Sequence, residues 1–303
     1  TVTVYDRMPS VARKLLIAGR GGLNLTHSEP SEVFKTRFGS HQAEVSSWLS
    51  QLDAQGVRDW AQTLGIDTFV GTSGRIFPTE MKAAPLLRAW LHRLRHPEVG
   101  VPVQFHMRHR WLGWQGEWLT FERQHDAQLV TVQARATLLA LGGASWPRLG
   151  SDGTWVPLLH AQGVDVVPLK PANCGFEVAV NGRPGWSDYF SQRHAGQPLK
   201  NVALRCSDSL RQEFSRKGEF VLSASGIEGS LVYALSADLR ETINRDGSAT
   251  LWLDLVPGRD EARLQADLSQ PRKGRSFGEH LRRQAGLDAV KTALVFETLG
   301  KDA

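Results

Sequence analysis

The chain has 303 residues, of which 41% are hydrophobic, and a net charge of +5. This length and apolar content exclude a disordered chain and predict one large domain with a smaller one, or two domains. Cys174 and Cys206 are too few for a disulfide framework and form no metal-binding spacing. Because we find no long apolar run and no leader pattern, we expect a cytoplasmic protein without membrane partner or metal site.

The first residues predict a strand followed by a short helix. TVTVYD (1–6) is rich in β-favouring residues and ends on an acid, Asp6, and SVARKLLIAG (10–19) predicts the helix. The chain begins without methionine and already inside an alternating β pattern. We therefore expect that a part of the protein upstream of this sequence is missing.

A glycine-rich loop comes next, with Gly19, Arg20, Gly21 and Gly22 in consecutive positions. Glycine allows positive φ and lets another molecule approach the backbone, but a tight turn uses the same residues. The loop fits neither a P-loop nor a dinucleotide fingerprint, which would need glycine where Asn24 stands. It combines backbone amides with a guanidinium, which is phosphate-binding chemistry without a standard pattern.

Helical spacing of apolar residues predicts three helices after the loop. Two short ones share the segment 43–64 around Gly56, and a third covers 82–96. The third carries a basic face, which is either solvated or an RNA contact.

Three β-rich runs then predict an antiparallel meander: 101–110, 117–124 and 129–143. The last run contains an unbroken apolar stretch, 136–141, typical of a strand buried on both faces. Gly142 and Gly143 follow it directly. They form either a turn or a point where a cofactor passes close to the backbone.

These features together indicate a dinucleotide lying across a sheet. An acid at the end of a strand, as Asp6 is, holds the ribose in dinucleotide folds and lies about 20 residues beyond the GxGxxG turn. That turn would then lie in the missing upstream part. The glycine loop and Gly142–Gly143 supply two points of close backbone approach.

The motifs resemble those of the HI0933-like family of FAD-dependent reductases, which includes bile-acid dehydro-steroid reductase-like proteins. The matching segments are RKLLIAGRGGLNLTHS (13–28), SGRIFP (73–78), LGGASWPRLGSDG (141–153) and, more loosely, GEFVLSASGIEGS (218–230). Leu23 stands where the family usually has cysteine, and Arg20 is shifted by one place. Ser223, Ala224 and Ser225 replace a Thr-His stretch, and Ser230 replaces proline, which indicates a distinct subfamily.

The resemblance implies an α/β fold: a Rossmann-like FAD/NAD(P)-binding domain with an antiparallel β-meander, plus an inserted β-barrel-like and helical domain. We place the first domain at 1–166 and the insert at 167–303, β-rich over 167–258 and helical over 259–303. Strands are expected at 201–209, 218–225 and 249–257. The resemblance also implies that the chain lacks the N-terminal GxGxxG and a C-terminal flavin-contacting segment.

The resemblance further implies that the cofactor is FAD and suggests which residues bind it. Asp6 would hold the ribose, and the loop from Gly19 to Asn24 would line the flavin, with Arg20 offsetting negative charge. Arg75 is either a site residue or part of a structural ion pair, and Asp152 and Gly153 either lie near the cofactor or cap the next helix, 155–162. The predicted cofactor-binding residues are Asp6, Arg13, Lys14, Gly19, Arg20, Gly21, Gly22, Asn24, Leu25, Thr26, Arg75, Gly142, Gly143, Asp152 and Gly153.

The resulting functional hypothesis is an FAD-dependent oxidoreductase that reduces an activated C=C bond of a small molecule, with NADH or NADPH as hydride donor. No catalytic acid stands out, but His27, His106 and Tyr233 are proton donors by chemistry alone. One alternative is a flavoenzyme that reduces uridine in RNA, using the helix 82–96 and the basic cluster 272–283. The other is a non-catalytic flavin-binding redox scaffold.

Overall fold

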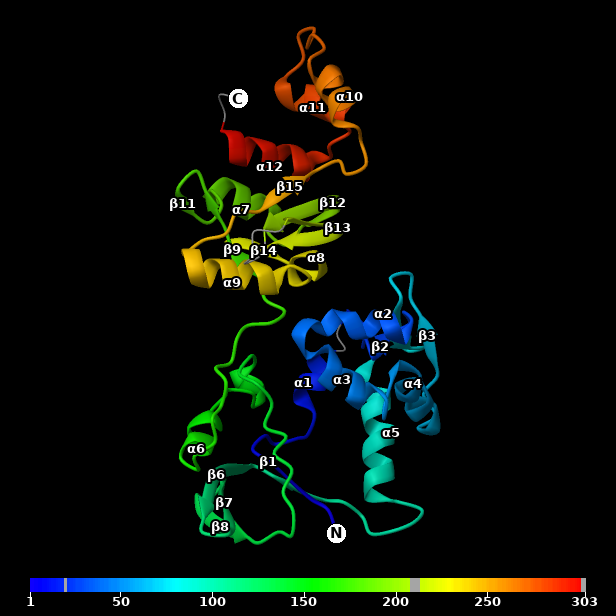
Figure 1. The fold of residues 1–303 in the computed structure, drawn as a ribbon, viewed down its shortest axis with the longest axis vertical. Helices are drawn as coiled ribbons and strands as arrows, with labels where there is room; N and C mark the ends of the chain where they lie inside the picture. The colour runs from blue at the N-terminus through cyan, green and yellow to red at the C-terminus, as the bar shows by residue number, and fades with distance from the viewer. Residues whose placement is uncertain (19–20, 208–212, 301–303) are drawn as a thin grey trace. The chain divides into compact units, whose positions relative to one another are not determined.

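The computed structural model describes residues 1–18, 21–207 and 213–300, so Gly19 and Arg20 of the glycine loop lie outside the described residues (Figure 1). The chain divides into two compact units, Thr1–Leu169 and Lys170–Ala303. The domain boundary expected between residues 166 and 167 stays a prediction. We describe each unit by itself.

The described part of unit 1 is a mixed α/β unit with three small sheets. One is a parallel pair of β1 (Thr3–Asp6) and β5 (Gln104–Met107). The second has the order β2-β4-β3, from Thr26–His27, Arg75–Pro78 and Thr68–Val70. The third is the antiparallel meander β6 (His109–Gln115), β7 (Trp118–Arg123) and β8 (Gln128–Val132). The predicted first strand forms, and so does a meander, but not with the predicted strands. Residues 104–107 of the run 101–110 form β5, which pairs in parallel with β1, and the first strand of the meander is β6 instead.

The predicted helices of unit 1 form, and α2, η2 and η3, which were not predicted, add to them. They are α1 (Arg13–Ala18), α2 (Ser31–Lys35), η2 (Thr36–His41), α3 (Gln42–Leu49), α4 (Ala54–Thr63), α5 (Ala83–Arg95), η3 (Pro147–Leu149) and α6 (Val156–His160). Asp53 accepts a hydrogen bond from Gly56 N and so starts α4. One apolar core, around Leu23, Ala61, Ala83 and Leu86, joins the glycine loop to α4 and α5. This core fixes the position of the loop.

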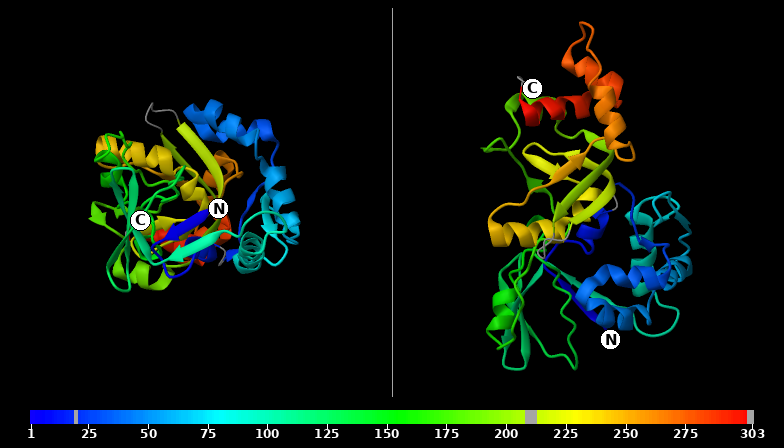
Figure 2. Two further views of the ribbon diagram at one scale, coloured as in Figure 1. Left: turned by 90° about the horizontal axis from the view of Figure 1, so that it is seen from below. Right: turned by 45° about the horizontal axis from the view of Figure 1, so that its top comes forward.

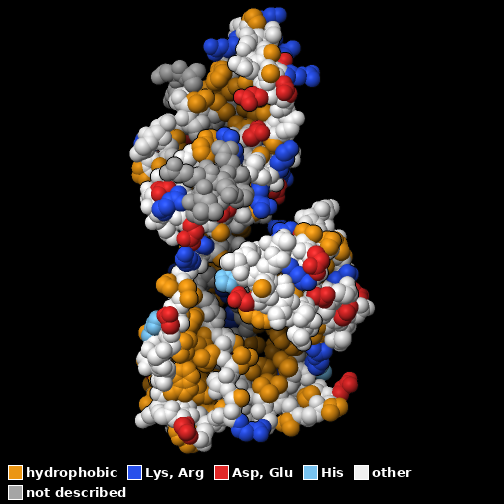
Figure 3. Space-filling model, in the orientation of Figure 1, with side chains coloured by type: hydrophobic (Ala, Val, Ile, Leu, Met, Phe, Trp, Pro, Cys, Tyr) orange, Lys and Arg blue, Asp and Glu red, His pale blue; other side chains and the backbone are white. Residues whose placement is uncertain are grey.

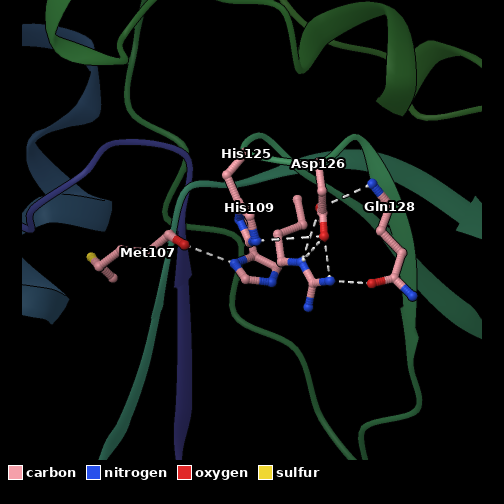
Figure 4. Close-up of polar contacts among 6 residues, drawn as sticks. Met107, His109, His125, Asp126 and Gln128 are labelled. Atoms are coloured by element: carbon pink, nitrogen blue, oxygen red, sulfur yellow. Dashed lines mark hydrogen bonds and ion pairs between the residues drawn. The ribbon is translucent and has the colours of Figure 1, made fainter.

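The turn between β7 and β8 is held by Asp126 (Figure 4). Arg123 and His125 pair with its carboxylate, which also accepts a hydrogen bond from Gln128 N. The hydrogen bond from Arg123 lowers the pKa of Asp126 to about 2, against desolvation, with the Gln128 amide and the nearby charges helping. The carboxylate therefore stays charged at any ordinary pH and closes the hairpin.

The segment 136–141 corrects a prediction. It forms no strand, and Leu138 is 91% exposed. A strand buried on both faces needs neighbours for its amides and for both rows of side chains. Within the described residues, β1 pairs with β5, and no strand pairs with 136–141. The segment is apolar, as a buried strand would be, but no part of the described chain covers it.

Unit 2 is built on one antiparallel sheet with the strand order β15-β12-β13-β14-β9. Its strands are β9 (Phe176–Glu177), β12 (Pro198–Ser207), β13 (Glu213–Leu222), β14 (Gly226–Glu228) and β15 (Trp252–Asp254), and β10 (Ala179–Val180) pairs separately with β11 (Arg183–Pro184). Strands form in all three expected segments with other bounds: residues 208–209 of the first segment lie outside the described residues, and only Trp252–Asp254 of 249–257 is a strand. In the described residues β15 and β9 are the two edges, so the sheet is open rather than a closed barrel.

Helices cover this sheet and extend beyond it. They are α7 (Asp188–His194), α8 (Ser230–Tyr233), α9 (Ser236–Asp246), α10 (Glu261–Leu268), α11 (Phe277–Ala285) and α12 (Ala289–Leu299). Figures 1 and 2 show α9 and α12 on opposite sides of the sheet. The main core joins Leu204 and Leu222 of the sheet to Leu239 of α9 and Leu294 of α12. The helices after residue 259 were predicted, whereas α7, α8 and α9 were not.

Candidate functional site

The strand β2 follows the glycine loop directly, and its pairing brings two of the sequence motifs together. Leu25 N donates to Ile76 O (2.9 Å), and Ser28 N donates to Gly74 O (2.8 Å). Between these bonds β2 pairs with β4, so that His27 lies opposite Arg75. The segments 13–28 and 73–78 are thus neighbours although some fifty residues separate them.

The loop is anchored on one side by apolar side chains. Leu23 is buried in the core with α4 and α5, and Leu25 packs against the same core. Asn24, between them, is exposed. Leu23 therefore occupies the family's usual cysteine position as a core residue, which explains why an apolar side chain is acceptable there.

The third motif lies against the end of β1 and against α1. Lys14 Nζ on α1 donates to Ser145 Oγ (2.7 Å), two residues after Gly143. Arg7, directly after Asp6, forms an ion pair with Asp152. These two contacts hold the predicted cofactor residues of the first and third motifs in one place.

Of the two carboxylates at this place, the chain engages Asp152 through both oxygens and Asp6 through one. Asp6 accepts a hydrogen bond from Met8 N (2.8 Å) through Oδ1. Asp152 accepts hydrogen bonds from Thr154 and from Arg7. Desolvation is the largest influence on the pKa of Asp152 and raises it, but the Thr154 and Arg7 bonds together lower it below its usual value. Asp152 does not cap α6, whose N-cap is Trp155 without a side-chain bond.

The predicted glycines differ in what surrounds them. A Cβ added at Gly21 or Gly143 would meet nothing within 4 Å. A Cβ at Gly22, which has φ +111°, would lie 2.6 Å from Met81 Cε. Gly21 and Gly143 thus leave open space beside the backbone, whereas the chain itself requires glycine at position 22.

The space at the third motif is lined by backbone and by one unusual hydroxyl. Gly142 has φ +70°, and a Cβ there would lie 3.2 Å from Ser151 Oγ; a Cβ at Gly153 (φ +71°) would lie 3.2 Å from Ala144 Cβ. Ser151 is buried, and its Oγ has no hydrogen-bond partner in the described residues. A buried hydroxyl without a partner is costly unless a ligand or water completes it.

The remaining predicted residues are less closely tied to this place. Arg75 is exposed on β4, opposite His27. Thr26 pairs with Ile76 in the same strands. Arg13 is half-buried at the start of α1. None of the three makes an ion pair among the residues that the structure describes.

The three proton-donor candidates have different surroundings. His27 Nδ1 accepts a hydrogen bond from Glu29 N (3.2 Å) and lies 3.6 Å from the Glu29 carboxylate, while Nε2 lies 3.1 Å from Ser73 O. His106 stacks on Tyr5, with ring centroids 4.8 Å apart. Tyr233 lies in α8 of unit 2. Of these, His27 has a carboxylate beside it and lines a pocket of about 200 Å³.

Sequence reasoning missed Arg7, Ser145 and Ser151. Arg7 follows the acid at the end of the first strand, but an exposed arginine and an ion-paired one look the same in a sequence. Ser145 and Ser151 lie inside the third motif, where the glycines drew attention first. Their roles depend on the folding back of 142–153 onto β1 and α1, which no local pattern reports.

The basic segments are partly engaged within the chain. On α5, Arg93 donates to Thr63 Oγ1 (2.9 Å), and Arg95 lies over the Phe105 ring (5.3 Å). In the cluster 272–283, Arg272 lies over Phe277 (5.6 Å) and Arg275 pairs with Glu279. Such contacts favour a structural role for these cations over phosphate binding.

Comparison with known proteins decides the family. A family model described as the HI0933-like protein Rossmann domain matches residues 1–300. The chain belongs to the HI0933-like family. A similar protein is a 3-dehydro-bile acid delta(4,6)-reductase of Clostridium scindens, 24% identical over 280 residues, which cover 92% of this chain. The chain spans 62% of the length of that HI0933-like relative.

The match confirms the resemblance of the motifs and the Rossmann-type character of the chain as an HI0933-like protein. Among the described residues, no helix is long and apolar enough to span a membrane. The same residues contain no group of three or more His, Cys, Asp or Glu side chains that could hold a metal ion.

Proposed function

We propose that the chain is part of an FAD-dependent oxidoreductase that reduces an activated C=C bond of a small molecule, with NADH or NADPH as hydride donor. The HI0933-like family match and the bile acid reductase among its relatives support this reaction class. Reduction of such a bond needs a hydride, and the Rossmann-type architecture is one that binds dinucleotides.

One observation carries the proposal within unit 1: separate glycine motifs meet around the end of β1. The Lys14–Ser145 hydrogen bond and the Arg7–Asp152 ion pair join segments that are more than a hundred residues apart in the chain. In open α/β sheets, ligands bind at the carboxyl ends of the strands, and Asp6 lies at that end of β1.

The residues present fit a dinucleotide. Open space borders the backbone at Gly21 and Gly143, and the buried Ser151 Oγ has no hydrogen-bond partner among the described residues. Asp6 would hold the ribose, and the glycines, Asn24 and Thr26 would line the flavin side, as the motifs imply. The flavin, when bound, supplies the hydride chemistry. The chain supplies orientation, backbone donors and exclusion of water.

We propose that His27 is the proton donor in this reduction. Because its Nδ1 accepts from Glu29 N, the neutral ring carries its proton on Nε2, which faces Ser73 O. Glu29 is held in place by Arg37, and its carboxylate lies 3.6 Å from Nδ1. A substrate that replaces Ser73 O at Nε2 would receive the proton of this nitrogen, and solvent would return a proton to the ring.

Two finer features belong to the same proposal. The insert begins at residue 167, and its sheet forms part of a barrel-like domain when the whole protein is assembled. The protein acts in the cytoplasm, as the two cysteines and the reducing donor suggest.

The test uses the full-length protein from which this sequence comes. Its absorption spectrum should show bound flavin, and anaerobic addition of NADH or NADPH should bleach that absorption. A bound flavin that neither donor reduces would favour the redox scaffold. Absence of flavin from the folded protein, even after incubation with FAD, would refute the proposal.

A further inference from the structure

A pocket of about 200 Å³ opens beside the strand end that follows the glycine loop. It is bounded by His27 of β2, by the residues that follow this strand, and by α2, α3 and the start of α4. Its apolar wall consists of Phe34, Leu49 and Ile76, and its polar wall includes Ser28, Ser31 and Arg58. A volume of this size admits a small organic molecule.

Two carboxylates also line the pocket, but the chain itself already engages both. Glu29 receives both the Nε and an Nη of Arg37, the latter at 2.7 Å. Asp53 accepts a hydrogen bond from Gly56 N (2.8 Å) as the cap of α4. The Arg37 pair and the α4 cap offset much of the negative charge of the lining.

Arg58 is the cation of the lining, and it is only partly used. Its Nε donates to Thr68 Oγ1 (3.1 Å), which fixes the guanidinium against the wall. Among the described residues it has no carboxylate partner, and its side chain is half-buried. The two terminal nitrogens of such an arginine match the two oxygens of a carboxylate.

We propose that this pocket binds a small organic monocarboxylate, with its carboxylate on Arg58 and its apolar body against Phe34, Leu49 and Ile76. The serine hydroxyls of Ser28 and Ser31 add hydrogen bonds at the polar end. The inference rests on the proposed function in that His27, its proton donor, lines the same pocket, and it names the class of molecule bound there. Binding itself requires neither flavin nor a hydride donor, so calorimetry tests it apart from the redox reaction.

The experiment measures binding of benzoate to the 303-residue chain by isothermal titration calorimetry, with benzamide and benzylamine as neutral and cationic counterparts. Benzoate should bind more tightly than either. Arg58→Gln should weaken benzoate about tenfold or more, since a charged hydrogen bond is lost. The affinity of Arg58→Lys for benzoate should lie between those of the natural chain and Arg58→Gln, because lysine keeps the positive charge but cannot bind both carboxylate oxygens as a guanidinium does.

The matched control is Arg88→Gln, which removes an exposed arginine of α5 outside the pocket lining and should leave benzoate binding unchanged. Leu49→Phe narrows the apolar end without touching Arg58 and should also weaken benzoate, so the proposal stays testable if Arg58→Gln does not fold. Equal benzoate binding by folded Arg58→Gln, tighter binding of benzylamine, or no benzoate binding to the folded chain would each overturn it.

Discussion

The glycines of the first and third motifs differ in what the fold requires of them. Gly22 adopts positive φ and lies against Met81, so the fold itself requires it. Gly21 and Gly143 have open space where a side chain would be, so folding does not require glycine there. The sequence shows the same residue type at all three positions, and only the surroundings separate a structural glycine from one that leaves room for a ligand.

Substituting these glycines should separate folding from cofactor binding. Gly22→Ala should lower the free energy of unfolding by about 1 to 3 kcal/mol, because alanine is strained at φ +111° and meets Met81. Gly143→Ala should leave stability unchanged but reduce flavin binding in the full-length protein. Urea denaturation and a flavin titration measure the two effects. Unchanged flavin affinity in Gly143→Ala would show that no cofactor passes there.

The Glu29–Arg37 pair should make stability depend on pH. The hydrogen bond from Arg37 is the main cause that lowers the pKa of Glu29, against desolvation, with the charges of Arg37 and His27 helping. A lowered folded pKa stabilises the fold above the unfolded value, about 4.3, and this contribution disappears as the pH falls through the folded pKa.

Glu29→Gln should therefore be less stable than the natural chain at pH 7, and the difference should shrink as the pH falls below about 4.3. Urea denaturation between pH 7 and pH 3.5 measures it. Glu32→Gln, at a side chain that is 85% exposed, serves as control and should show little difference. A gap that stays constant with pH would contradict the pairing.

At the scale of elements, α12 is fixed to the sheet of unit 2 by a buried lysine. Lys291 is 7% exposed, and its Nζ donates to Asn201 O (3.0 Å) and Leu255 O (2.7 Å). At the other end of the helix, Glu297 accepts hydrogen bonds from Ser187 N and Oγ. Polar contacts at both ends thus fix the orientation of a helix whose middle is apolar.

Lys291→Met keeps the length of the side chain and removes both hydrogen bonds. The two carbonyl groups would lose a charged donor, so we expect a loss of about 1 to 3 kcal/mol in the free energy of unfolding. Chemical denaturation followed by circular dichroism measures it. Lys200→Met, at an exposed lysine of β12, should change stability little. Equal stability of Lys291→Met and the natural chain would mean that the cost of burying the charge cancels the bonds.

The elements that sequence could predict are those whose burial is local. The helices α4, α5 and α10 to α12 show apolar residues at helical spacing because one face of each packs inward. The pairing of β2 with β4 was not predicted, since two-residue strands have no periodicity to detect. The prediction of a buried strand at 136–141 was wrong, because an apolar run shows that a segment favours burial but does not show which neighbour would bury it.

At the scale of the molecule, the two units have separate cores. The core around Leu204 and Leu294 and the core around Leu281 contain only residues of unit 2, and the core around Leu23 only residues of unit 1. Apolar side chains also remain on the surface of unit 1, which occupies the lower part of Figure 3. They include Trp118, Leu129 and Leu138.

Residues 170–303 should therefore fold alone. We expect a cooperative urea transition for this fragment and the same loss from Lys291→Met as in the whole chain, within about 0.5 kcal/mol, because distant sites act additively. Circular dichroism and denaturation of both polypeptides measure this. A fragment without a cooperative transition would show that unit 2 depends on the rest of the chain.

The candidate site was predictable only in part at this scale. The motifs pointed to Lys14, Gly143 and Asp152, because glycine and charge at fixed spacing are visible in one dimension. The partners that hold them, Arg7 and Ser145, come from other segments and carry no pattern of their own. Long-range pairs of this kind depend on the folded path of the chain.

The backbone bonds at Leu25–Ile76 and Ser28–Gly74 close the segment 29–73 into a long loop between β2 and β4. Its second half is tied to unit 1, because Ala61 of α4 lies in the core beside Leu23 and β3 pairs with β4. The entropy of closing a loop grows slowly, by about 0.6 kcal/mol for each doubling of length, so the first half, 29–53, can change in length at little thermodynamic cost while the glycine loop keeps its anchor. Phe34 and Leu49, the apolar wall of the Arg58 pocket, belong to this first half, so a change in its length would alter which ligand the pocket admits.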